Sequence, residues 1–338
     1  IAQKLLPYLK NISTIYFAPS GVLHSLNLGA IPIDEQTTFS EQYELHSLGS
    51  TRQILYRSET TSNSTVTDAL LYGGVDYQLD QSSPILTSEE PIESIIAFAD
   101  DFSSLGNAYR AYRGNDWHPL EWTAREVEDL DMLLQSSGKK ATILRDFEAT
   151  EASFKAIGVH APSPKIIHLA THGYFFPDPK SRKQRKKAAQ SGFQTSEHPM
   201  IRSGLILAGA NHVWKGGDLI EGKEDGILTA YEIAQMDLTN TEIVVLSACK
   251  TGLGDIESSE GIFGLQRAFK MAGAKYILMS LWSVDDKKTF EFMTAFYTNW
   301  QAHQQSIPQA FQNAQNEMKE KYADLGSPQA WAGFVLVE

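Results

Sequence analysis

Short runs of apolar residues punctuate this 338-residue chain and predict buried β-strands. Most of these runs contain β-branched residues, are too short for a helix and end in glycine or a polar residue. This pattern is typical of strands in a parallel sheet that is covered on both faces. The run within residues 242–254 (EIVVLSACKTGLG) passes directly into a glycine-containing turn, and we take this stretch as the centre of the fold. The other predicted strands lie at residues 14–18, 69–75, 142–144, 165–170, 203–208 and 276–281.

Helical periodicity occupies the segments between these strands. Residues 120–134 carry an apolar stripe with acidic residues on the first turns, and residues 261–271 form an amphipathic pattern that Gly273 is placed to cap. The alternation of strand and helix from residue 165 to residue 300 predicts a doubly wound α/β fold. Further helices are predicted at residues 150–157, 228–236, 289–300 and 307–322, with Asp286 as the N-cap of the 289–300 helix.

Composition and charge restrict the class of protein. A hydrophobic content of 42% and an aromatic content of 10% suffice for one large α/β unit or two domains. A net charge of −12 argues against a nucleic-acid or anionic-membrane binder, which needs the opposite sign, and no apolar run approaches the roughly 20 residues that span a bilayer. One cysteine excludes an internal disulfide and fits a reducing compartment, so we expect the cytoplasm. Because the chain starts at Ile1 rather than Met, we expect a fragment or a processed product.

The single cysteine, Cys249, is the main candidate for chemistry. It follows the apolar run of residues 242–254, and open α/β sheets place their chemistry at the carboxyl ends of strands. The run at residues 165–170 ends just before His172, so a thiol and an imidazole are predicted at one rim. A cysteine nucleophile and its acid/base partner need that arrangement, whereas a cysteine that only fills the core does not need a histidine beside it.

Other motifs do not support a metal, phosphate or serine-hydrolase site. His168 and His172 are four strand residues or about 13 Å apart, so no single ion joins them and His168 is interpreted as core. Residues 217–224 imitate a phosphate-binding loop, but Glu224 stands where a magnesium-binding Ser or Thr belongs and no strand precedes the loop. No serine has glycines two residues to either side, as an esterase nucleophile has. We therefore predict no metal and no cofactor.

Several segments together resemble the CHAT domain, a family of bacterial caspase-like and separase-like cysteine peptidases often found behind tetratricopeptide repeats. The N-terminal part matches more weakly, through residues 18–31 and the PLEWTAREVEDL helix at residues 119–130. The matching segments are IHLATHG (167–173), LTAYEI (228–233), VVLSACKTGLG (244–254), EGIFGLQRAFKMAGAKYILMSLWSVDDKKT (260–289), FY (296–297) and QAWAGFVL (329–336).

The resemblance implies a caspase-like, mostly parallel sheet flanked by helices, in two parts. Residues 1–140 would form a degenerate caspase-like half and residues 141–338 the catalytic half. It also implies a protein substrate, an activating partner or an upstream tetratricopeptide or sensor region, a role in bacterial defence or signalling, and no binding to membranes or nucleic acid. The chain departs from the family pattern in a basic insertion at residues 180–187 and a longer gap between Gly254 and Glu260, both near the predicted active-site rim.

By this resemblance, His172 and Cys249 form a catalytic dyad. The thiolate of Cys249 would attack the scissile carbonyl, and His172 would take the thiol proton and deliver it to the leaving amine. Backbone N–H groups of Gly173 and Cys249 would hold the oxyanion. With no third residue evident, we expect a backbone carbonyl to orient the imidazole. The predicted function is a cysteine endopeptidase for a specific protein; the alternatives are a catalytically silent caspase-like scaffold and a hydrolase of a small amide.

The resemblance also locates the pocket for the substrate side chain that precedes the scissile bond. In caspase-like folds the residue two before the nucleophile lies beside this pocket, and here it is Ser247. A neutral hydroxyl cannot offset the desolvation of a guanidinium or ammonium group. Leu281 and Trp282, after the neighbouring strand, are expected to complete an apolar wall. These residues predict cleavage after an uncharged, medium-sized apolar residue, with Arg, Lys and Asp disfavoured, unless Asp285, Asp286 or Glu260 folds into the pocket.

Overall fold

A large, mostly parallel β-sheet forms the centre of the protein. The computed structural model describes residues 2–34, 37–56, 68–79, 116–176, 198, 200–247, 259–282, 284–322 and 328–338. In these ranges the sheet has eight strands in the order β1-β2-β11-β10-β9-β5-β3-β4. They are β1 (Thr14–Phe17), β2 (Glu44–Ser47), β11 (Phe334–Val337), β10 (Tyr276–Ser280), β9 (Ile243–Leu246), β5 (Ile166–Leu169), β3 (Asp68–Val75) and β4 (Lys140–Asp146).

The two strands that lead toward the predicted dyad lie in the middle of this sheet. Every residue of β5 and of β9 is buried, because helices cover both faces, and this is why both strands read as unbroken apolar runs. They pair in parallel, with Ile166 opposite Ile243 and Leu169 opposite Leu246. The β10–β11 pair is the antiparallel one in the described sheet.

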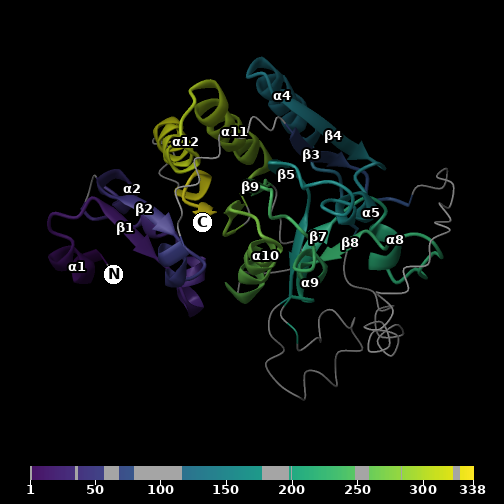
Figure 1. The fold of residues 1–338 in the computed structure, drawn as a ribbon, viewed down its shortest axis with the longest axis horizontal. Helices are drawn as coiled ribbons and strands as arrows, with labels where there is room; N and C mark the ends of the chain where they lie inside the picture. The colour runs from purple at the N-terminus through teal and green to yellow at the C-terminus, as the bar shows by residue number, and fades with distance from the viewer. Residues whose placement is uncertain are drawn as a thin grey trace.

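Helices pack on both faces, which confirms the predicted doubly wound architecture (Figure 1). Alternate strand residues separate the two cores: Val244 and Leu246 face α10, whereas Ile243 and Val245 face α4 and α11. The first face carries α5 (Glu151–Lys155), α9 (Ala230–Ile233) and α10 (Ser259–Ala272), and the second carries α4 (Thr123–Ser136), α11 (Asp286–Tyr297) and α12 (Ile307–Lys321).

The remaining described helical elements are short. Six belong to the N-terminal region and its connections, and the others follow β7, α11 and α12 along the chain. They are α1 (Ala2–Leu5), η1 (Leu6–Tyr8), η2 (Gly21–Ser25), η3 (Leu28–Ala30), α2 (Phe39–Gln42), η4 (Thr51–Tyr56), α8 (Asn211–Trp214), η5 (Thr298–Ala302, a π-helical turn) and η7 (Pro328–Ala330).

A second, antiparallel sheet stands beside the first and was not anticipated. It consists of β6 (Gly173–Phe175), β7 (Ser203–Ile206) and β8 (Ile227–Thr229). The predicted strand at residues 203–208 belongs here rather than to the main sheet, and the predicted helix at residues 228–236 is β8 followed by α9. Both apolar runs are fully buried, so their composition could not reveal to which sheet they belong.

The two predicted halves of the chain share the main sheet. Strand β3 of residues 1–140 lies between β4 and β5 of residues 141–338, so the sheet does not divide at residue 140, and the two-domain boundary stays a prediction. At the other edge, β2 meets β11 through the single residue pair Ser47 and Val337. The Asn27 side chain strengthens this weak joint by donating to the carbonyls of Ala332 (2.9 Å) and Phe334 (3.0 Å).

The N-cap of α11 is Asp285, one residue before the predicted position. Its side chain accepts a hydrogen bond from the Lys288 N–H at 3.2 Å. Asp286, which was expected to cap this helix, instead accepts from the Trp122 N–H at 3.0 Å and so ties the start of α11 to the start of α4. A sequence with two adjacent aspartates cannot distinguish these roles because both residue types suit a cap.

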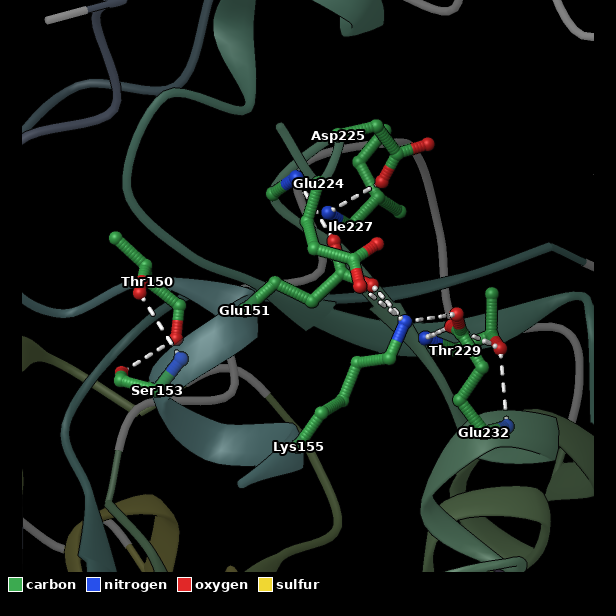
Figure 2. Close-up of polar contacts among 10 residues, drawn as sticks. Thr150, Glu151, Ser153, Lys155, Glu224, Asp225, Ile227, Thr229 and Glu232 are labelled. Atoms are coloured by element: carbon green, nitrogen blue, oxygen red, sulfur yellow. Dashed lines mark hydrogen bonds and ion pairs between the residues drawn. The ribbon is translucent and has the colours of Figure 1, made fainter. Parts of the chain in front are cut away.

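A cluster of charges holds the second sheet against α5 (Figure 2). The Lys155 Nζ lies 3.3 Å from Glu151, 2.9 Å from Glu224 and 3.2 Å from Glu232. Burial lowers the pKa of Lys155, but the three carboxylates outweigh burial and raise it. Burial, followed by neighbouring acids, raises the pKa of Glu151, whose other oxygen accepts from the Gly226 N–H at 2.9 Å. Lys155 is therefore the cation on which these carboxylates depend.

We predict that Lys155→Met lowers the free energy of unfolding by about 2–3 kcal/mol, since it leaves the buried Glu151 carboxyl group without its cation. Lys215→Met is the matched control, because Lys215 forms one exposed ion pair with Asp116 and such pairs contribute about 0–1 kcal/mol. Urea unfolding of both variants measures the difference. Equal midpoints for the two variants would contradict the role given to Lys155.

Candidate active site

His172 lies at the rim where the two central strands leave the sheet. It comes three residues after Leu169, the last residue of β5, and Cys249 comes three residues after Leu246, the last residue of β9. The Ser247 N–H donates to the Leu169 carbonyl at 3.0 Å, so the ends of β5 and β9 lie side by side (Figure 1). Cys249 and Gly254 lie outside the described residues.

A backbone carbonyl orients the His172 ring, as the sequence led us to expect. The Nε2 atom lies 2.8 Å from the carbonyl oxygen of His118. A carbonyl only accepts hydrogen bonds, so Nε2 carries the hydrogen. In the neutral imidazole Nδ1 is then the acceptor nitrogen. The ring is thus prepared to receive a proton at Nδ1.

Aromatic rings hold the imidazole on two sides. Its centroid lies 5.1 Å from the Tyr77 ring and 4.9 Å from the Trp117 ring, and His172 is buried. The Tyr77 hydroxyl shares a hydrogen bond of 3.0 Å with Thr171, and burial raises the pKa of Tyr77, so this phenol stays neutral. The packing restricts rotation of the ring about its side-chain torsions.

Asn211 fixes the segment that supplies the His118 carbonyl. Its amide accepts from the Trp117 N–H at 2.8 Å and donates to the Trp117 carbonyl at 2.9 Å. The Asn211 N–H in turn donates to the Tyr77 carbonyl at 2.9 Å, and the side chain is fully buried. Sequence reasoning missed Asn211, because nothing local marks an asparagine whose partner is 94 residues away.

The residues predicted to hold an oxyanion are only partly described. Gly173 directly follows His172 and begins β6, where it pairs with Leu205. The other predicted donor, the backbone N–H of Cys249, lies outside the described ranges. The oxyanion assignment therefore stays a prediction.

A buried polar cluster lies beneath the rim at Ser247. The Ser247 hydroxyl donates to Oε1 of Glu126 on α4, and the same oxygen lies 2.7 Å from Nε2 of His168. His168 Nδ1 lies 3.3 Å from the Tyr297 hydroxyl. All four residues are at most 1% exposed, which confirms His168 as a core residue. Glu126 was missed, although its spacing from Leu130 and Leu134 placed a carboxylate on the apolar stripe of this helix.

The structure does not bring the Ser247 and Leu281 side chains together. Leu281 belongs to the core on the α10 face, where it lines a cavity of about 330 Å³ beside Gln266, whereas Ser247 contacts α4 on the opposite face. Trp282 is partly buried and packs against both cores, near Gly333. The pocket of Ser247, Leu281 and Trp282 thus stays a prediction, and Leu281 faces away from its expected partner.

The described residues lack two features that would indicate other functions. No three His, Cys, Asp or Glu side chains within those ranges are grouped as metal ligands. None of the helices there has the length and apolar character needed to cross a bilayer.

Known proteins with related sequences match parts of the chain. Tetratricopeptide repeat protein 28 from Mus musculus is 31% identical over 114 residues, and the protein of the same name from Homo sapiens is 29% identical over 114 residues. Each match covers 33% of this chain and 4% of the relative, so the chain corresponds to a small part of these proteins.

Solved structures with a similar fold match almost the whole chain. The Arg-specific cysteine proteinase gingipain R (RgpB) gives a TM-score of 0.54 at 11% identity, and the complex of Porphyromonas gingivalis RgpB pro- and mature domains gives 0.51 at 11%. Both matches cover 99% of this chain and 66% of the other. At this identity the likeness shows the fold, which is that of caspase-like cysteine proteinases. A family model described as the CHAT domain matches residues 1–338, and the chain therefore belongs to the CHAT domain family.

Proposed function

We propose that the protein is a cysteine endopeptidase in which Cys249 is the nucleophile and His172 its acid/base partner. The observation that carries this proposal is the hydrogen bond from His172 Nε2 to the His118 carbonyl. It assigns the acceptor role to Nδ1 at the rim where the cysteine-bearing strand ends. A histidine that served only packing would not need its tautomer fixed at the carboxyl edge of a parallel sheet.

The reaction follows from these groups. Nδ1 of His172 takes the Cys249 thiol proton, and the thiolate attacks the carbonyl carbon of the scissile peptide bond. Backbone N–H groups of Gly173 and Cys249 stabilise the oxyanion. The C–N bond breaks as the imidazolium gives its proton to the departing amine, which leaves a thioester. Water then attacks the thioester, His172 takes its proton, and the acid product leaves as the thiol is restored.

The substrate is a specific protein, and activation depends on a partner or an upstream region. The similarity to proteins named for tetratricopeptide repeats supports a repeat region as that partner, since such repeats form extended binding surfaces. The alternative is a silent caspase-like scaffold with this fold and no chemistry. Reactivity of Cys249 separates the two functions, because a scaffold has no reason to keep an activated thiol.

We predict that Cys249→Ala and His172→Ala each reduce cleavage at least 10³-fold while leaving a folded protein, because each removes a reacting group without opening a large cavity. Proteomic mapping of cleavage sites with wild type and Cys249→Ala identifies the substrate. Labelling by a peptidyl electrophile is unambiguous, since the chain has one cysteine.

The matched control is His160→Ala, at an exposed histidine, which should leave cleavage and labelling unchanged. Near wild-type turnover by either dyad variant would refute the dyad. Unreactive Cys249 together with retained partner binding would support the scaffold.

We predict that Asn211→Ala slows labelling of Cys249 at least tenfold. The loss of two buried hydrogen bonds costs about 2–4 kcal/mol in stability and releases the segment that holds the His118 carbonyl. NMR exchange of the His172 Nε2 proton separates positioning from stability: exchange should accelerate while the rest of the core stays protected. Asn240→Ala is the comparison, because it also removes an amide hydrogen bond, to the Ser163 carbonyl, which is partly buried and lies at the opposite end of β5. Unchanged exchange in Asn211→Ala would contradict the positioning role.

A further inference from the structure

The cluster of Glu126, His168, Ser247 and Tyr297 has one consistent arrangement of hydrogens. The Tyr297 hydroxyl is fully buried, and His168 Nδ1 is its one hydrogen-bond partner in the described ranges. If Tyr297 donates to Nδ1, His168 is neutral and its Nε2–H donates to Glu126. A charged His168 would instead leave the hydroxyl hydrogen of Tyr297 without an acceptor among the described residues. With His168 neutral, every polar group of the cluster has a hydrogen-bond partner except one oxygen of Glu126.

One carboxyl oxygen of Glu126 is left unused. Its Oε1 accepts from both His168 and Ser247, whereas its Oε2 is buried and has no hydrogen-bond partner among the described residues. No lysine or arginine in the described ranges forms an ion pair with it. A buried carboxylate in this condition is costly unless a donor, and preferably a cation, completes it.

The position of this carboxylate suits a ligand group that arrives from the catalytic rim. Ser247, which contacts Glu126, is two residues before Cys249, and covalent geometry alone keeps the two Cα atoms within about 7 Å. An arginine or lysine side chain reaches a similar length beyond its own Cα. A substrate residue bound at Cys249 can therefore extend its terminal cation to the Glu126 carboxylate.

We propose that Glu126 is the specificity acid of this peptidase and receives the Arg or Lys side chain that precedes the scissile bond. The proposal rests on the proposed function and replaces the expectation of a neutral pocket at Ser247. That expectation allowed for an acid only from residues that follow Ser247 in sequence, whereas Glu126 comes from α4, 121 residues before Ser247. Glu126 is 1% exposed, so the incoming side chain displaces the groups that cover it.

The test compares two pools of peptides that differ in the last group. One pool ends in agmatine, which is arginine without its carboxyl group, and the other in 3-methylbutylamine, the leucine equivalent; upstream positions are mixed in both. Binding is measured by calorimetry on the Cys249→Ala protein. We expect the agmatine pool to bind at least 30-fold more tightly than the 3-methylbutylamine pool. Adding Glu126→Gln to the Cys249→Ala protein should reduce this affinity ratio below threefold, by weakening the binding of the agmatine pool alone.

Glu128→Gln is the matched control, because Glu128 lies two residues along the same helix, is exposed and pairs with Arg145. Glu128→Gln should leave the ratio of agmatine-pool to 3-methylbutylamine-pool affinity unchanged. Glu126→Asp, which retains the charge on a shorter stem, should restore part of the preference and covers the case in which Glu126→Gln does not fold. Equal or tighter binding of the 3-methylbutylamine pool, no binding of the agmatine pool, or a ratio that survives Glu126→Gln overturns the proposal.

Cleavage by the wild-type protein distinguishes this proposal from the proposed function. If the agmatine pool binds more tightly but no peptide is cleaved, the Glu126 proposal stands and the proposed peptidase function is wrong. If the protein cleaves after apolar residues and Glu126→Gln does not change this, the peptidase function stands and the role of Glu126 as specificity acid is wrong.

Discussion

The hydrogen bond between His172 Nε2 and the His118 carbonyl is the constraint on which the candidate site depends. This hydrogen bond fixes the tautomer with the hydrogen on Nε2, so Nδ1 is the nitrogen that can take a proton. A carboxylate in that place would also orient the ring, but it would favour the charged imidazolium. A neutral carbonyl orients the ring without adding a charge that favours the imidazolium, as suits a group that must first accept a thiol proton and then release it.

The fold places this bond through elements distant in sequence. Strand β5 brings His172 to the rim, Asn211 from α8 holds the segment with the carbonyl, and the second sheet begins immediately after His172. The charge cluster around Lys155 joins that second sheet to α5 (Figure 2). The small sheet therefore serves as the support of the imidazole, which explains why polar groups are buried there at a cost in desolvation.

Much of this could be predicted from sequence, and the failures share one physical cause. The buried runs around His172 and Cys249 identified central strands, because helices on both faces demand continuous apolar residues. The expected carbonyl could not be assigned to His118, nor could Asn211 or Glu126 be found, because their partners lie 54 to 121 residues away. Periodicity reports which face of an element is buried, and it carries no information about which distant group that face meets.

The protonation of His172 tests the account most directly. Nitrogen-15 NMR of the imidazole reports which ring nitrogen bears the hydrogen, without requiring a substrate. The account predicts a neutral ring with the hydrogen on Nε2, and an Nδ1 resonance that shifts when the Cys249 thiol is alkylated while Nε2 is little changed. A ring with its hydrogen on Nδ1, or an Nδ1 resonance indifferent to modification of Cys249, would contradict it.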